Sequence, residues 1–251
     1  MNLNEMTRRD FQRNTLGALL TYSLLESLAS ADAFSAEIRP VAAKWLAEVN
    51  SVGQELRDKK LKQTEWQTQI ESLFTKIELP ELLKFIDFEK LTADLKHRSK
   101  GEKSLRMKFP EVEGLPTNLV FGHQLFALRK DRSVVPHGHD NMATAFLVLK
   151  GDFAGKHYDR MRDGKDHMII KPTIDGRFKA GGCTTISDHK DNIHWFKCAS
   201  DVGFIFNIHV LNLVAGKRSG RVYVDPKGEK IGGGLLKARK LKTQEAYDLY
   251  G

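Results

Sequence analysis

The sequence has little of what several common kinds of site require. Its two cysteines, Cys183 and Cys198, are too few and too far apart for a zinc knuckle. No apolar run is long and apolar enough to span a membrane stably, and Ser187 has no G-x-S-x-G nucleophile context. The triplet at 232–234 lacks the adjoining Lys-Ser/Thr of a phosphate-binding loop, so it predicts a plain loop.

Charge and composition describe a folded protein with a basic surface. The net charge is +8 and the isoelectric point is near 9.4, but lysine and arginine are spread along the chain among acidic residues. This mixture is typical of a solvated surface, and no arginine-aromatic motif indicates a nucleic-acid module. A hydrophobic share of 41% supports a sizeable core within one large or two small domains.

The most informative stretch, 136–152, has two histidines one residue apart and then an apolar run. In a β-strand, residues i and i+2 point to the same face, so His137 and His139 would direct both imidazoles at one point. Neutral imidazole is the commonest protein ligand of transition metals. The short apolar run Ala145–Leu149 predicts a strand in a buried sheet, and Lys150-Gly151 predicts the turn after it.

A second stretch, Ile186–Phe196, contains two more histidines, His189 and His194. The segment between the two stretches is rich in Gly, Asp and Lys, which predicts a hairpin plus loop. Alternating apolar residues in Leu119–Leu128 and Val202–Leu213 predict further strands. Converging histidines are costly to bury without a ligand. The pattern therefore favours a metal site over a barrel whose histidines only hydrogen-bond inside it.

The first stretch resembles the first motif of the cupin superfamily, whose jelly-roll β-barrels hold a metal inside the barrel. His137, His139 and Gly151 match that motif, while Thr144 stands where most cupins have a glutamate ligand. The resemblance covers about Leu119–Leu213. It implies a mainly β fold, an antiparallel cupin-like jelly-roll barrel with an α-helical N-terminal region, and a site without an anionic protein ligand.

The second stretch is similar to the second cupin motif, because His194 matches its histidine while His189 stands at its usual proline. The resemblance therefore implies three metal ligands: His137, His139 and His194. Four further residues are expected in the cavity or in contact with the ligands: Thr144, His189, His209 and Cys198. Two histidines of the polar hairpin, His157 and His167, are interpreted as facing solvent.

The two cysteines leave an alternative open. In an oxidising compartment Cys183 and Cys198 could form a disulfide, whereas two unpaired buried thiols are an equally good interpretation. Cys198 lies four residues beyond His194. Along a strand both residues would face the same side, so Cys198 is expected to point into the barrel near the metal.

The N-terminus resembles a twin-arginine export signal. Arg8 and Arg9 precede a bulky apolar residue, Thr15–Leu25 is a modest apolar stretch, and two A-x-A sequences follow. The resemblance implies a periplasmic protein that contacts the export machinery transiently and crosses folded, with a mature chain beginning near Asp32 or Phe34. The alternative is an amphipathic first helix, because leucines recur at helical spacing in this segment.

The other segments have different periods. Apolar residues recur at helical spacing through Glu37–Arg98, which predicts helices packed on the barrel, or a separate partner-binding helical module.

The C-terminal region is rich in Gly and Lys, and a short helix is expected at Gln244–Tyr250. The expected organisation is a signal segment at 1–33, a helical region at 34–100, a cupin-like barrel at 101–214 and a basic tail at 215–251.

Three neutral imidazoles would leave one divalent metal with its full charge and with up to three open positions. This arrangement resembles the thiol dioxygenases, which are cupins that also lack the glutamate. The resemblance implies an Fe(II)-dependent oxygenase, hence an oxidoreductase, acting on a small anionic or thiol substrate. Zn, Mn and Ni are left open as the metal.

Two other functions stay open at this point. One is a non-catalytic metal- or ligand-binding cupin. The other is isomerase- or hydrolase-type chemistry with Zn or Mn, which needs an acid or base near the metal; Asp188 and Asp191 are the candidates beside His194. A small-molecule substrate is the expected partner, nucleic acid is not expected, and a homodimer is left open.

Overall fold

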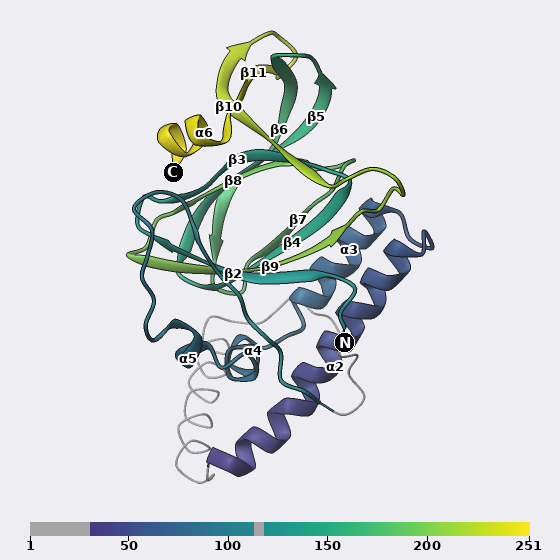
Figure 1. Cartoon of the computed structure of the whole chain (residues 1–251), viewed down its shortest axis with the longest axis vertical. Coiled ribbons are helices and arrows are strands. Elements are labelled where there is room, and N and C mark those ends of the chain that lie inside the picture. Colours follow the sequence, from purple (N-terminus) through teal and green to yellow (C-terminus); the bar gives the residue numbers. More distant parts are fainter. Residues whose placement is uncertain (1–30, 113–117) are drawn as a thin grey trace, which may run out of the picture. The chain divides into compact units, whose positions relative to one another are not determined.

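The computed structural model describes residues 31–112 and 118–251, and the chain divides into two compact units, Met1–Val41 and Ala42–Gly251. The predicted export signal, with Arg8 and Arg9, lies outside the described residues. No helix within the described ranges is both long enough and apolar enough to cross a membrane. The second unit contains the later part of α2, the strands and the candidate site (Figure 1).

Helices come first in the described chain and strands follow. The helices are α2 (Ala31–Arg57), α3 (Gln63–Phe74), α4 (Leu79–Phe85), α5 (Phe88–Thr92) and, after the strands, α6 (Thr243–Tyr250). The helical periodicity of Glu37–Arg98 thus corresponds to α2–α5, and the short helix expected at Gln244–Tyr250 corresponds to α6. Pro80 stands in the first turn of α4, where its missing N–H has no intrahelical partner to lose.

The strands form an antiparallel jelly roll. They are β1 (Lys103–Leu105), β2 (Gly122–Arg129), β3 (Ser133–Asp140), β4 (Met142–Lys150), β5 (Asp152–Asp163), β6 (His167–Lys179), β7 (Cys183–Ile186), β8 (Ile193–Cys198), β9 (Val202–Leu211), β10 (Gly220–Lys230) and β11 (Leu236–Leu241). Between β2 and β9 the chain crosses repeatedly between two sheets, of order β2-β9-β4-β7 and β3-β8-β5-β6, the jelly-roll arrangement of eight strands. The predicted mainly β fold, an antiparallel jelly roll with helices before it, is confirmed.

The sheet β2-β9-β4-β7 is buried on both faces. In β4, Ala145 belongs to the apolar cluster shared with the helices, whereas Phe146 and Val148 belong to the cluster between the two sheets. The indole N–H of Trp45 donates to the carbonyl of Leu73 at 2.9 Å and ties α2 to α3; the part of α2 from Ala42 onward lies with α3 along the outer face of this sheet in Figure 1. Burial on both sides explains why β4 is apolar almost throughout.

The other sheet curls and closes into a ring of six strands. The hairpin β10–β11 completes the ring, because β10 pairs with β3 and β11 pairs with β6. This sheet has a separate core on each face, because side chains alternate along β8. Ile193 packs in a small apolar cluster inside the ring, whereas His194 and Phe196 face the jelly-roll interior. The small cluster consists of Tyr158, Met168, Ile170, Ile193, Val224 and Ala238.

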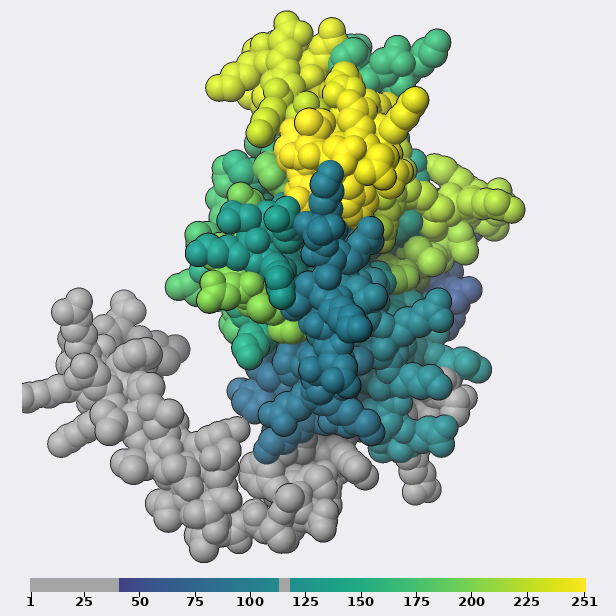
Figure 2. All heavy atoms as spheres, turned by 60° about the vertical axis from the view of Figure 1, so that its left-hand side comes forward, coloured from purple at the N-terminus to yellow at the C-terminus, as the bar shows by residue number. Residues whose placement is uncertain are grey.

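Helix α6 covers part of this ring. Its Ala246 and Tyr250 are buried against Val135 of β3. The hydroxyl of Tyr247 donates to the Glu102 carboxylate at 2.9 Å and ties α6 to the segment before β1. Figure 2 shows the helix in yellow beside this segment in blue.

The two strands of the C-terminal region were not predicted from the sequence. Residues 215–251 were expected to form a basic tail, yet they contain β10, β11 and α6. Few positions of these strands are buried; Val224 and Ala238 are examples, and the residues around them are largely charged or polar. A strand that buries so few side chains has a weak alternation signal.

Gly228→Ala should destabilise the hairpin that closes the ring. A Cβ at Gly228 would lie 2.2 Å from the carbonyl oxygen of Lys237 on the facing strand, and backbone cannot yield as a side-chain tip can. We expect a loss of roughly 1–3 kcal/mol in the free energy of unfolding, measured by urea denaturation. Gly176→Ala is the matched control, because nothing lies within 4 Å of a Cβ there. Equal losses in both variants would contradict this explanation.

Candidate metal centre

Three histidines meet inside the jelly roll. His137 and His139 lie on β3, and His194 lies on the neighbouring β8, where it is directly paired with His137 across the ladder. Alternation along β3 sends both of its histidines to the interior, as the H-x-H spacing predicts. None of the three is more than 3% exposed.

The three Nε2 atoms form a small triangle. Nε2 of His137 lies 3.0 Å from that of His139 and 3.1 Å from that of His194, and the third side is 3.3 Å. A metal about 2.1 Å from each nitrogen would require sides of about 3.0 Å for right angles and about 3.4 Å for tetrahedral angles. The triangle therefore has the size of three ligands around one metal ion, and each histidine offers one ligand atom to it.

Partners on the outer side of two rings leave Nε2 free. Nδ1 of His137 lies 2.7 Å from the carbonyl oxygen of Val135, which can only accept, so Nδ1 carries the proton. Nδ1 of His139 lies 3.1 Å from the Thr144 hydroxyl, which can accept a hydrogen bond from its N–H in the same way. Outer partners of this kind fix the tautomer of metal-ligating histidines. Nδ1 of His194 is buried and has no such partner among the described residues.

Burial keeps the three imidazoles neutral. Desolvation lowers the pKa of His137 to about 3, and the positive charge of Arg221 adds to the shift. The pKa values of His139 and His194 lie well below the ordinary value, first because of burial and then because of the neighbouring imidazoles and Arg221. Neutral imidazole is the form that binds metals. The donor set therefore fits a divalent cation.

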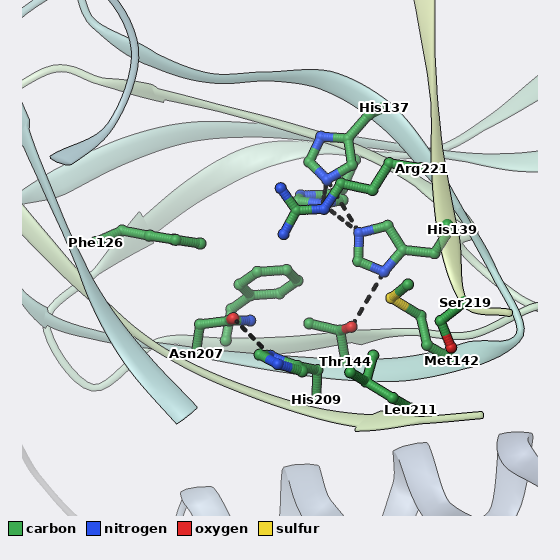
Figure 3. A pocket seen from close by; sticks show the side chains of 13 residues that line it. Phe126, His137, His139, Met142, Thr144, Asn207, His209, Leu211, Ser219 and Arg221 are labelled. Atoms are coloured by element: carbon green, nitrogen blue, oxygen red, sulfur yellow. Dashed lines mark hydrogen bonds between the residues drawn. The ribbon is translucent and has the colours of Figure 1, made fainter. Parts of the chain in front are cut away.

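The triangle borders a cavity of about 250 Å³ (Figure 3). Beside the three histidines, the lining combines apolar and polar residues of β2, β4, β9 and β10 and the residue before β10: Phe126, Met142, Thr144, Phe146, Asn207, His209, Leu211, Ser219, Gly220 and Arg221. No carboxylate of the described residues lines this cavity. A bound metal would keep its positive charge, and the space suits a small molecule.

Arg221 is a charged residue of the cavity that was not predicted from the sequence. It is paired with His139 across the β3–β10 ladder, and Figure 3 shows its guanidinium beside His137 and His139. Its charge also contributes to the lowered pKa of His209. The signal that could have indicated it is the spacing Arg221-x-Tyr223, which alternates as a strand does, but the segment was interpreted as a tail.

The four residues expected beside the ligands have different places. Thr144 and His209 line the cavity. His189 does not, because it is exposed in the loop between β7 and β8. Cys198 faces the interior, as alternation requires, but packs in the apolar cluster rather than at the cavity. Four residues at about 3.3 Å each place Cys198 roughly 13 Å along the strand from His194.

The cysteines are both free. Cys198 is buried and Cys183 is partly buried, and desolvation raises the pKa of the Cys183 thiol to about 11. Of the two alternatives left open by the sequence, the structure therefore contains the unpaired thiols. A thiol with a raised pKa is a poor nucleophile at neutral pH.

The interpretation of His157 as facing solvent is wrong. His157 is fully buried and lies on β5 directly opposite His194 of β8. The hairpin of β5 and β6 exists, but the early part of β5 lies in the jelly-roll sheet and turns alternate residues inward, Phe153 among them. The polar composition of the segment concealed this alternation. His167, at the start of β6, is partly exposed.

Comparisons with known proteins give distant likenesses. No family model and no curated protein matches the chain. Similar solved structures include procruciferin, an 11S globulin from Brassica napus, at 11% identity and a TM-score of 0.31 over 42% of this chain and 23% of that one. The vicilin from Solanum melongena is 10% identical, with a TM-score of 0.33 over 44% and 27%. The chain thus spans about a quarter of these structures, and the jelly roll is established by its own strand order.

Replacing any one histidine of the triangle should remove most bound metal. Two remaining imidazoles would bind a divalent metal much more weakly than three. We therefore expect His137→Ala, His139→Ala and His194→Ala to lose most of the metal that the unmodified protein retains, measured by elemental analysis after dialysis. His189→Ala is the matched control, because His189 is exposed and away from the cavity. Unchanged metal content in His137→Ala and His194→Ala, or a greater loss in His189→Ala, would contradict this assignment.

His157→Phe should reduce the acid sensitivity of the metal-free protein. Burial lowers the pKa of His157 from 6.5 to about 3. Between these values the unfolded chain binds a proton that the folded chain does not, so stability falls as pH falls. Between pH 8 and pH 5 the variant should lose about 2 kcal/mol less than the unmodified protein in urea denaturation. An unchanged pH dependence would contradict the buried, neutral state of this ring.

Proposed function

We propose that this chain is a metal-binding cupin-fold protein that acts as an Fe(II)-dependent oxygenase on a small anionic or thiol substrate. The observation that carries the proposal is the triangle of neutral Nε2 atoms, with sides of 3.0, 3.1 and 3.3 Å, beside a cavity without a carboxylate. His137, His139 and His194 would hold the metal. When bound, Fe(II) supplies the electron transfer that makes dioxygen reactive toward an organic substrate.

The cavity supports an anionic substrate through Arg221. Its guanidinium is the positive group that lines the space beside the triangle in the described chain. A carboxylate or similar anion bound there could form charge-assisted hydrogen bonds, which are stronger than neutral ones. Phe126 and Phe146 supply apolar walls that shield the reacting part of the substrate from water.

His209 is suited to accept a hydrogen bond from the substrate. It lines the cavity, and burial, helped by Arg221, lowers its pKa to about 4, so its ring is neutral at pH 7. Its Nδ1 lies 3.4 Å from the side-chain oxygen of Asn207, which orients the ring. A neutral imidazole in this place could accept a hydrogen bond from a protonated group of the substrate and so orient it.

The carboxylates expected for isomerase- or hydrolase-type chemistry have structural partners instead. Asp188 accepts hydrogen bonds from the side chain of Gln63 and from the backbone N–H of Asn141. Asp191 is buried in the loop before β8 and does not line the cavity. The acid or base of that alternative would have to be His209. A non-catalytic binding role is the second candidate and is separated from the first by oxygen consumption.

The iron-loaded protein should consume oxygen with small thiol or anionic probes. We would compare 3-mercaptopropionate with 2-mercaptoethanol, which replaces the carboxylate by a hydroxyl, and add acetylacetone as an anionic probe without sulfur. Arg221→Gln should raise KM for the mercaptocarboxylate roughly tenfold or more, because a charged hydrogen bond is lost. Arg218→Gln, an exposed arginine outside the cavity lining, is the control. No oxygen uptake with any probe would contradict the oxygenase and favour the binding role.

We also propose export by the twin-arginine route, supported by the order of arginine pair, apolar stretch and small residues in the N-terminal segment. Replacing Arg8 and Arg9 together by Lys should leave precursor in the cytoplasm of a host that has this pathway. The measurement is the periplasmic yield, with the unmodified chain as reference. An unchanged yield in the double variant would defeat the localisation.

A further inference from the structure

His194 and His157 are neighbouring buried residues, and each has at least one ring nitrogen without a hydrogen-bond partner among the described residues. Nδ1 of His194 and both ring nitrogens of His157 have no hydrogen-bond partner among the described residues. The two residues are directly paired across β8 and β5, with ring centroids 6.4 Å apart and planes at 71°. An unsatisfied buried polar group is costly, and a single partner shared by the two rings would satisfy Nδ1 of His194 and one ring nitrogen of His157.

His194 differs in this from the other two histidines of the triangle. His137 has the Val135 carbonyl on its outer nitrogen, and His139 has the Thr144 hydroxyl. A histidine that binds a metal almost always donates its second ring N–H to a carboxylate, a carbonyl or a water. Nδ1–H of His194 therefore requires a hydrogen-bond acceptor, and no described residue lies close enough to supply one directly.

The neighbours of His194 restrict where that acceptor can come from. The rings of Phe146 and Phe196 flank it, with centroids at 4.7 and 5.5 Å, and neither can accept a conventional hydrogen bond. His157 is the polar side chain that lies next to them, fully buried on the adjacent strand. A neutral imidazole has one nitrogen that accepts.

We propose that His157 is the positioning residue of His194, and that a single buried water accepts a hydrogen bond from the Nδ1–H of His194 and donates one to a ring nitrogen of His157. The inference rests on the proposed metal centre. A hydrogen bond spans about 2.9 Å, and two in series cross a gap that one cannot. Buried waters occupy such places, between polar groups that are otherwise unsatisfied. His157 thereby holds the Nε2 of His194 toward the triangle and keeps it unprotonated.

Zinc affinity tests this role without reference to oxygenase activity. The Kd for Zn²⁺ would be measured by chelator competition on the full metal-free chain and on three variants. His157→Phe should bind zinc 10–100-fold more weakly, because the acceptor is lost. His157→Gln keeps an acceptor oxygen and should recover most of the affinity. His123→Phe is the matched control, since His123 bonds to the Met107 carbonyl outside the cavity lining and should leave the Kd unchanged.

Each outcome decides a different claim. If the unmodified chain binds zinc and His157→Phe binds within threefold of it, the positioning role is overturned while the metal centre stands. If the unmodified chain binds no zinc, both fall. If His157→Phe fails to fold, a high-resolution crystal structure of the zinc-loaded unmodified chain decides. A water bonded to both rings supports the role, and its absence overturns it.

Discussion

The structure depends on the burial of neutral imidazoles between two apolar sheets. Three of them direct their Nε2 atoms to one point, and each is almost wholly removed from water. A lone pair in that position gains nothing from solvent, so the arrangement is stabilised only by hydrogen bonds on the outer nitrogens and by whatever the inner nitrogens bind. The hydrogen bonds on Nδ1 of His137 and His139 therefore help to stabilise the buried rings. Nδ1 of His194 has no such partner among the described residues.

The two layers around the jelly roll keep this arrangement fixed. Helices α2–α5 cover one sheet, and the other sheet curls into a ring with a core of its own, so the strands that carry the histidines are supported away from the cavity. Sites built on strands held in this way keep their geometry better than sites on loops. The same curl brings β10 beside β3 and so places Arg221 at the cavity. The triangle of histidines and the Arg221 guanidinium are therefore both positioned by one sheet.

The sequence predicted the parts of the site that depend on local spacing. H-x-H on a strand gives two imidazoles on one face from the period of the strand alone, and His194 was found from a motif with its own spacing. Three residues depended instead on how strands pair over long distances. Arg221 reaches the cavity through the closure of the ring, His157 turns inward because β5 lies in the jelly-roll sheet, and Cys198 lies too far along β8. Local alternation indicates a face but does not indicate which strand becomes its neighbour or how far along it a side chain lies.

We propose that one divalent metal is held by three imidazoles and by no carboxylate or thiolate of the chain. X-ray absorption spectroscopy of the metal-loaded protein measures this most directly, because imidazole rings give a characteristic multiple-scattering pattern. We expect one metal per chain, with the scattering of three imidazoles at about 2.0–2.1 Å. A sulfur neighbour at about 2.3 Å, or a shell without imidazole scattering, would contradict it.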